Sequence, residues 1–348
     1  MIFFGIYVCL FCLVLFLSFM DKEKDKYVVG AYIAIAVVLV LIVGLRPIGL
    51  DKDSGEYEKF YYVGDLLVEP SFNIISDIAQ KWLGGLRGVL IIYAVLSIPL
   101  MAYAVSRSTK LWFLSIGVWM SHFFLLQNTT QIRVAVATGI FILALQFLIE
   151  KKRLAYALMI GVAIFFHYSA IVLLPLAFLG CDELSERWKM VLVVMPLAAY
   201  VVSPSNIGWL SAIPIPGIQD KLEIYEEMRD SGVMNMDQIN RFNIVSLLKL
   251  AMYYFLLWKY DLIKRHFPQM ALFLKIYAFS IISFAMLAFL PVLAFRVSEI
   301  FGVVEIILFP YIIYAIRPRI AGQILLLLFA TAILAMDILY NQLLNLNV

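Results

Sequence analysis

Long apolar runs alternate with short polar connections along the whole chain. The apolar runs approach or reach the roughly 20 residues that a helix needs to cross a bilayer. We therefore predict an all-α polytopic membrane protein, with a single transmembrane domain over residues 1–348 built from about eleven apolar segments. These segments are 1–19, 27–45, 89–105, 111–126, 132–149, 154–180, 190–202, 242–258, 271–290, 297–316 and 320–340.

The segment 154–180 is too long for one crossing. Its 27 residues would make a helix of ~40 Å, whereas the hydrocarbon core is ~30 Å thick. If the chain instead turns near His167 and comes back as two half-helices, the basic connections 181–189, 259–266 and 317–319 all become cytoplasmic, as the positive-inside rule requires. The length and the charge pattern together predict a broken or re-entrant pair.

The same charge pattern predicts which connections share the opposite, outer side. Residues 1–19 lack the positive n-region of a cleavable signal peptide, so we interpret them as a retained first helix whose N-terminus lies outside. Residues 46–88 and 203–241 become a first and a second outer loop. Each loop contains an amphipathic helix, the first with an apolar stripe expected to lie in the membrane interface. That stripe consists of Phe72, Ile75, Ile78, Ala79, Trp82 and Leu83.

Composition agrees with this class and narrows the chemistry. Hydrophobic residues make up 64% of the chain and charged residues 15%, and the net charge of +3 is too small to indicate nucleic-acid binding. A Cys9-x-x-Cys12 spacing is compatible with redox or metal chemistry. Because these cysteines lie in an apolar helix without nearby His or acidic residues, packing is the favoured interpretation, and we predict no metal site and no cofactor.

The first outer loop opens with several candidate residues. Arg46 either places its charge among lipid headgroups or binds an anion. The Asp51-x-Asp53 pair suits a divalent cation or a general base, or else it is solvated. Tyr57 begins a run of aromatic residues that form an interfacial belt or offer flat faces to sugar rings.

Further candidates come from the other connections on the outer side. Gln131 and Arg133 point roughly 200° apart on a helix, so only one faces a given cavity, and the charge of Arg133 favours it. His167 can accept a proton near neutral pH, or it only fixes the turn. Arg296 and Glu299 lie one turn apart and either form a salt bridge or present an arginine, held by Glu299, to an anion.

Taken in order, these residues resemble a known family. The motifs are Arg46-x-x-Gly49-x-Asp51 leading to Tyr57, Glu69-Pro-x-Phe72, Gln131-x-Arg133, Phe166-His167-x-Ser169-Ala170, and Ala294-Phe-Arg296-x-x-Glu299 with Glu305 before Pro310. Their order and spacing resemble the EpsG-like branch of Wzy-type polysaccharide repeat-unit polymerases, over roughly residues 40–180 and 290–310.

The resemblance implies a multi-pass glycosyltransferase of the bacterial inner membrane, GT-C-like in architecture, with a periplasmic active site. It would transfer a growing glycan from undecaprenyl pyrophosphate to a new lipid-linked repeat unit, in O-antigen (lipopolysaccharide), capsule or exopolysaccharide assembly. Implied partners are these glycans, the bilayer, and a chain-length regulator and flippase of the same pathway. His167 would be the base, with Asp51 the alternative. Arg46, Arg133 and Arg296 would bind the pyrophosphate, and Gln131, Tyr57 and Glu299 would contribute to substrate binding.

Two other functions fit parts of the pattern. A flippase or transporter for lipid-linked oligosaccharides would also bury arginines, although alternating access usually comes with internal repeats, which this sequence lacks. An O-antigen ligase, which joins finished glycan to a lipid core, is a closer alternative, and only the order of the motifs argues against it.

Overall fold

The computed structural model describes residues 2–20, 25–63, 68–202 and 239–345, which are predominantly helical. The chain divides into two compact units. Unit 1 comprises Met1–Cys181, Asp261–Gln269 and Val303–Val348, and unit 2 comprises Asp182–Tyr260 and Met270–Gly302. This division by contacts does not test the expected single transmembrane domain, which stays a prediction.

Unit 1 contains the long apolar helices. Among the described residues, four helices are long and apolar enough to cross a membrane, namely α2, α5, α7 and α16, and several shorter apolar helices accompany them. The chain is therefore a multi-pass membrane protein. The elements of unit 1 are α1 (Ile2–Ser18), α2 (Lys26–Gly44), α3 (Ser54–Val63), α4 (Pro70–Trp82), α5 (Leu86–Ser108), α6 (Trp112–Ser121), the π-helix η1 (Phe124–Thr130), α7 (Ile132–Ile149), α8 (Arg153–Phe166), the 3-10 helix η2 (Tyr168–Phe178), α15 (Glu305–Leu308), the 3-10 helix η3 (Phe309–Tyr314) and α16 (Arg319–Leu339).

Several predicted spans coincide with observed helices. The predicted span 132–149 has the same bounds as α7, and the spans 27–45 and 320–340 differ from α2 and α16 by one residue at each end. These boundaries follow from the sequence because Lys26, Arg46 and Pro318 flank the apolar runs. A charge or a proline thus marks where each of these helices begins or ends.

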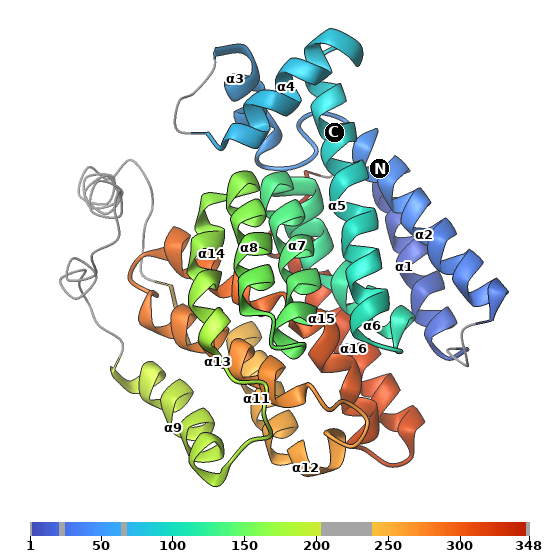
Figure 1. The fold of residues 1–348 in the computed structure, drawn as a ribbon. Coiled ribbons are helices and arrows are strands. Elements are labelled where there is room, and N and C mark those ends of the chain that lie inside the picture. The colour runs from blue at the N-terminus through green and yellow to red at the C-terminus, as the bar shows by residue number, and fades with distance from the viewer. Residues whose placement is uncertain (1, 21–24, 64–67, 203–238, 346–348) are drawn as a thin grey trace. The chain divides into compact units, whose positions relative to one another are not determined.

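Helix α5 packs between α2 and α7 in unit 1 (Figure 1). Small residues on α7 allow this close approach. A Cβ atom at Gly139 would lie only 3.1 Å from the side chain of Leu100 on α5, and Ala135 and Ala137 are buried beside it. Packing through small residues is a common way for helices to associate within membranes.

Helices α8 and η2 form the predicted hairpin. The Tyr156 hydroxyl donates a hydrogen bond to the Leu173 carbonyl at 2.8 Å. In one continuous helix, residues 17 positions apart would be separated by ~25 Å. The prediction that 154–180 is broken near His167 is therefore confirmed, while its re-entrant course in the membrane stays a prediction.

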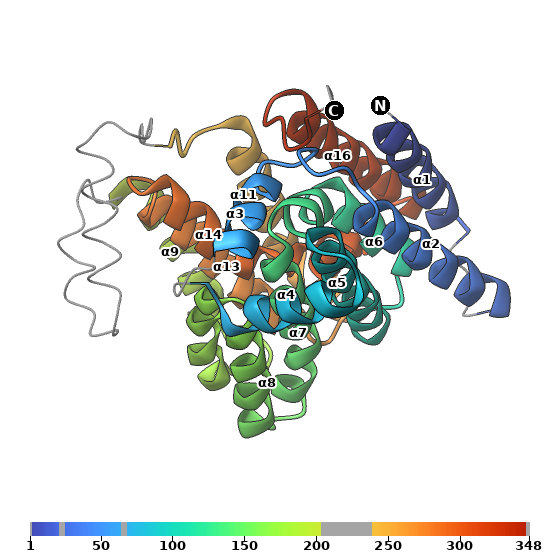
Figure 2. The same cartoon turned by 90° about the horizontal axis from the view of Figure 1, so that it is seen from above.

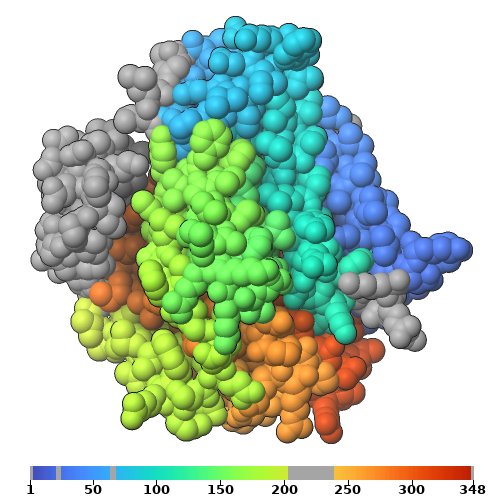
Figure 3. Space-filling model, in the orientation of Figure 1, coloured from blue at the N-terminus to red at the C-terminus, as the bar shows by residue number. Residues whose placement is uncertain are grey.

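The first outer loop forms a cap on one end of unit 1. Figure 2 shows α3 and α4 above the ends of α5 and α8, and Figure 3 shows α4, in light blue, at the surface of this end. The predicted apolar stripe of α4 is divided between two environments. Phe72, Ile75 and Ala79 are buried against the protein, whereas Ile78 and Trp82 are exposed. The exposed half alone is available for the expected contact with the membrane interface.

Unit 2 contains α9 (Glu186–Val202), α11 (Ile244–Trp258), α12 (Tyr260–Ile263, which continues into unit 1), α13 (Met270–Met286) and α14 (Pro291–Gly302). The Tyr253 hydroxyl on α11 donates to the Leu192 carbonyl on α9 at 2.8 Å, and Ser280 on α13 donates to the Ser298 carbonyl on α14 at 2.7 Å. The second predicted outer loop, 203–241, lies outside the described residues except for 239–241.

The predicted apolar segment 297–316 is not one regular α-helix. Helix α14 ends at Gly302, and the chain continues through a turn into α15 and then into η3. Pro310, near the start of η3, lacks the N–H group that an α-helix would need there. Hydrophobicity alone could not show these breaks, because the run is apolar on both sides of each one.

Basic connections gather at the other end of unit 1, around two tyrosines. Phe267 stacks on Tyr311 with ring centroids 4.2 Å apart, and His266 stacks on Tyr314 at 4.0 Å. The guanidinium of Arg319 lies 4.8 Å from the centre of the Tyr314 ring. His266 and Arg319 belong to the connections 259–266 and 317–319, which the positive-inside rule assigned to one side. Their cytoplasmic location stays a prediction.

Candidate functional site

A carboxylate joins an arginine and a histidine at the capped end of unit 1. One oxygen of Glu69, Oε1, lies 2.9 Å from His167 Nδ1, and the other, Oε2, pairs with Arg133 Nη1. The exposed fractions of these side chains are 5% for Glu69, 10% for His167 and 19% for Arg133. We call these three residues the Glu69 cluster. Its two basic residues come from segments far apart in the sequence.

Local backbone structure places each member of this cluster. Pro70 occupies the first turn of α4, where its missing N–H costs nothing, and it keeps Glu69 in an extended conformation. His167 ends α8 and is also extended, with φ −153° and ψ 114°. The next backbone N–H, from Tyr168, donates to Glu69 Oε1 at 3.3 Å. The helix break predicted from length and charge is therefore the feature that brings the imidazole to the carboxylate.

Glu69 is ionised at neutral pH. Burial alone would raise the pKa of its carboxyl, but the hydrogen bond with His167 and the charge of Arg133 outweigh burial and lower the pKa to about 2. An ionised carboxylate can only accept hydrogen bonds, so His167 Nδ1 is the donor. In the neutral imidazole, Nε2 then carries the lone pair that can accept a proton.

Aromatic rings surround the guanidinium of Arg133. Its central carbon lies 5.7 Å from the centres of the Tyr57 and Phe60 rings and 5.8 Å from that of Phe72. A guanidinium has five N–H donors, and the geometry commits one of them to Glu69. The group is thus charged, held by aromatic faces and still able to donate several hydrogen bonds, which suits a phosphate or pyrophosphate.

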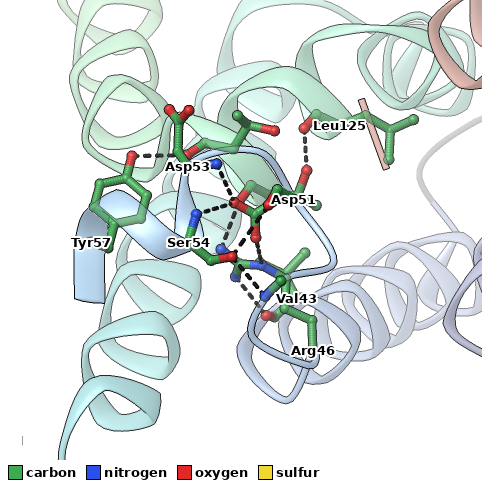
Figure 4. Close-up of polar contacts among 10 residues, drawn as sticks. Val43, Arg46, Asp51, Asp53, Ser54, Tyr57 and Leu125 are labelled. Carbon is green, nitrogen blue, oxygen red and sulfur yellow. Dashed lines mark hydrogen bonds and ion pairs between the residues drawn. The ribbon is translucent and has the colours of Figure 1, made fainter. Parts of the chain in front are cut away.

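Arg46 and Asp51 pair with each other beside this cluster (Figure 4). Arg46 Nε donates to Asp51 Oδ2 at 3.0 Å, and neither side chain has exposed surface. Gly49 makes the pairing possible, because its φ of +92° turns the chain back in a conformation that other residues rarely adopt. We call these two residues the Arg46–Asp51 pair.

The other predicted site residues are placed differently. Gln131 connects η1 to α7, and its half-buried side chain makes no hydrogen bond with a described residue. Arg296 and Glu299 lie on α14 in unit 2. Arg296 is exposed and forms no ion pair with a described residue, so the alternative of an Arg296–Glu299 salt bridge is not realised. Tyr57 donates its hydroxyl to the Thr130 carbonyl at 2.8 Å while its ring lies against Arg133.

Sequence reasoning missed two acidic partners. Glu69 was noted only as part of a motif, since one acid before a proline carries no periodic signal. Asp337 is buried near the end of α16 and lies 2.6 Å from His122 Nδ1, and no spacing in the sequence links them. Among the described residues, no group of three or more His, Cys, Asp or Glu side chains is arranged to hold a metal ion.

The fold and the site define a multi-pass helical membrane protein in which one buried carboxylate pairs with an arginine and a histidine. The profile of the EpsG family matches residues 29–347, and the chain belongs to this family, which is linked to exopolysaccharide biosynthesis. No curated protein and no solved structure matches the chain.

Proposed function

We propose that the protein is a glycosyltransferase that polymerises lipid-linked oligosaccharide repeat units, and that the Glu69 cluster is its catalytic centre. The arrangement of this cluster carries the proposal. One buried carboxylate orients an imidazole and also holds a guanidinium, which has five N–H donors and pairs with this carboxylate through Nη1. Membership in a polysaccharide-biosynthesis family supports the same class of reaction.

In this reaction the growing glycan leaves an undecaprenyl pyrophosphate carrier. His167 Nε2 accepts the proton of the attacking sugar hydroxyl, and the oxygen of that hydroxyl forms a new bond to the anomeric carbon. The bond from that carbon to the pyrophosphate oxygen breaks, and its electron pair leaves with the pyrophosphate. Arg133 stabilises the charge that develops on this leaving group. His167 Nε2 is shielded from solvent here, so the acceptor reaches it only after a local rearrangement.

The proposal places the cluster on the periplasmic side of the bacterial inner membrane. The outer loop, Arg133 and the His167 turn meet at one end of unit 1. At the other end (Figure 1), His266 and Arg319, from the basic connections 259–266 and 317–319, both contact Tyr314. Positive charge at the cytoplasmic end agrees with the positive-inside rule. Chain-length regulators and a flippase of the same pathway are its proposed partners.

The test is a replacement of His167 by Ala in cells that lack their own copy of the gene. We expect single repeat units to accumulate on the outer leaflet, measured by extraction and mass spectrometry of carrier-linked glycans. The matched control is His266→Ala, which removes an exposed histidine at the opposite end of unit 1. Long chains at wild-type level in His167→Ala would refute the role of this imidazole as the base.

Two other outcomes separate the alternative functions. Repeat units trapped on the cytoplasmic leaflet would indicate a flippase. Long carrier-linked chains that fail to reach a lipid core would indicate a ligase. Either result would replace the polymerase proposal, because a polymerase defect leaves the carrier loaded with one repeat unit on the outer leaflet.

A further inference from the structure

The two oxygens of Asp51 have different tasks (Figure 4). Oδ2 accepts from Arg46 Nε, as described above. Oδ1 accepts the backbone N–H of Ser54 at 2.8 Å and that of Asp53 at 3.1 Å. These N–H groups belong to the start of α3, where the first donors of a helix need an acceptor and a negative charge is favourable. Asp51 therefore sets where α3 begins, and so where Tyr57 lies one turn later.

Arg46 holds two other parts of the chain. Its Nη1 donates to the Val43 carbonyl at 2.9 Å, and its Nη2 donates to the Thr129 carbonyl at 2.6 Å. All three nitrogens of the guanidinium are engaged, and the side chain has no exposed surface. A direct contact between Arg46 and a substrate therefore requires disruption of this arrangement.

The Thr129 carbonyl lies at a special point of the backbone. The π-helix η1 ends at Thr130, and α7 begins at Ile132. Where one helix type changes into another, carbonyls lose their partners within the helix. Arg46 supplies a donor to the Thr129 carbonyl, and Tyr57 supplies one to the Thr130 carbonyl. Arg133 is the second residue of α7, directly after this junction.

We propose that Arg46 and Asp51 are positioning residues for Arg133. Through Arg46 the pair fixes the junction from which Arg133 projects. Through the start of α3 it places the Tyr57 ring against the Arg133 guanidinium. This inference rests on the proposed function of Arg133, and it gives the pair a role without contact with the substrate. A misplacement of about 1 Å at a reacting group can cost up to about 100-fold in rate.

The first test is Arg46→Lys in the full-length protein in nanodiscs, supplied with lipid-linked repeat units. Lysine keeps the charge but cannot donate to three differently placed acceptors. We expect kcat to fall by about 10- to 100-fold with KM little changed. Hydrogen–deuterium exchange of the backbone at residues 129–133 should become faster. Without the bond from Arg46 to the Thr129 carbonyl, the junction opens more often, and its N–H groups are exposed during each opening.

A second, milder variant tests the same proposal if Arg46→Lys fails to fold. Tyr57→Phe keeps the ring against Arg133 but removes the hydroxyl, which donates to the Thr130 carbonyl and also interacts with the Arg133 side chain. Exchange at the junction therefore reads the Thr130 contact separately from any direct effect on Arg133. We expect a smaller fall in kcat, by about 3- to 10-fold, which is the range of one hydrogen bond, and faster exchange at the same junction. The matched control is Tyr62→Phe on the same helix, whose ring is exposed and whose replacement should change neither quantity.

The outcomes decide between positioning and binding. A raised KM with unchanged kcat and unchanged exchange at residues 129–133 would overturn the proposal, because it would show that Arg46 meets the substrate. Faster exchange without any loss of activity would overturn it as well. Full activity in Arg133→Ala would refute the proposed function, not the positioning of the junction by Arg46. Hydrogen–deuterium exchange does not depend on catalysis, so it would still show whether Arg46 stabilises the junction.

Discussion

Two buried carboxylates at one end of unit 1 each pair with an arginine, yet their surroundings differ. Asp51 and Arg46 have no exposed surface, and every nitrogen of Arg46 donates to the protein. Arg133 is 19% exposed, gives one N–H to Glu69 and has aromatic rings around it instead of carbonyls. An arginine whose three nitrogens all donate to its own chain can hold structure, whereas one that donates mainly to a single carboxylate can bind a ligand.

The comparison predicts that substitutions in the two places fail in different ways. The largest effect on stability is expected for Asp51→Ala, because it leaves the buried charge of Arg46 without its partner. Removal of one member of a buried ion pair costs about 3 to 5 kcal/mol in the free energy of unfolding. Unfolding in detergent, by heat or denaturant, measures it. The control is Glu56→Ala, from an exposed pair on α3, and an equal loss in both variants would contradict the contrast.

Arg133→Ala should instead affect catalysis. We expect kcat/KM to fall by about 1000-fold, or about 4 kcal/mol of transition-state stabilisation, which is typical for a desolvated charge that meets an ionic partner. Glycan transfer in nanodiscs measures this value. The variant also loses the stabilisation that Arg133 gives to the buried Glu69 carboxylate, so transfer is measured well below the unfolding transition of the variant. Arg87→Ala, at an exposed arginine near the start of α5, is the control. Wild-type transfer in Arg133→Ala would exclude this guanidinium from the site.

The pH dependence of stability tests how strongly His167 and Arg133 hold the Glu69 carboxylate. The pKa of Glu69 is lowered from 4.5 to about 2. A carboxyl whose pKa is lower in the folded state than in the unfolded state stabilises the fold fully at any pH above its unfolded-state pKa. That stabilisation is lost as the pH falls toward the folded-state pKa. Glu69 should contribute about 3 kcal/mol at pH 7, and roughly half of this should be lost by pH 3.

Glu69→Gln provides the reference for this measurement. The difference in unfolding free energy between wild type and Glu69→Gln should narrow as pH falls from 5 to 3. A difference that stays constant over this range would show that the carboxylate gains nothing from His167 and Arg133. The comparison with the glutamine variant removes the contribution of the other acids, which titrate in both proteins.

The smallest effect is expected at an exposed pair. Lys59 and Glu56 lie 2.6 Å apart on α3, but their side chains are 69% and 54% exposed. Water screens such pairs, and they contribute little to stability. Lys59→Ala should leave both the unfolding transition and the rate of glycan transfer within error of wild type. A large loss of glycan transfer in Lys59→Ala would show that the substrate site includes the exposed surface of α3.

Much of the helical framework follows from the sequence. Bilayer thickness imposes a length on apolar runs, so α2, α7 and α16 were predicted nearly to the residue. The hairpin at His167 followed from an excess of length together with the distribution of basic residues. The break after Gly302 did not, because lipid-exposed and protein-buried apolar residues look alike in a sequence.

The sequence predicted most residues of the candidate site, but it did not predict which of them pair with each other. Arg133 and His167 stand out as ionisable groups in apolar segments, whereas Glu69 lies in an ordinary polar loop. The pairing of Arg46 with Asp51 depends on the positive φ of Gly49 and on a carbonyl at the end of a π-helix. Neither the turn nor the irregular helix has a reliable sequence signal, so the sequence could not separate a structural arginine from a binding one.

Asp51 both pairs with Arg46 and accepts hydrogen bonds from the first N–H groups of α3, and this restricts how this part of the chain can vary over evolution. Many buried ion pairs can be exchanged for two apolar side chains at little cost in stability. Here that exchange would still leave the first N–H groups of α3 and the Thr129 carbonyl without partners. Variants at position 51 should therefore keep a side-chain oxygen, as asparagine does. Substitution at position 46 should be tolerated only with a compensating change near residue 129.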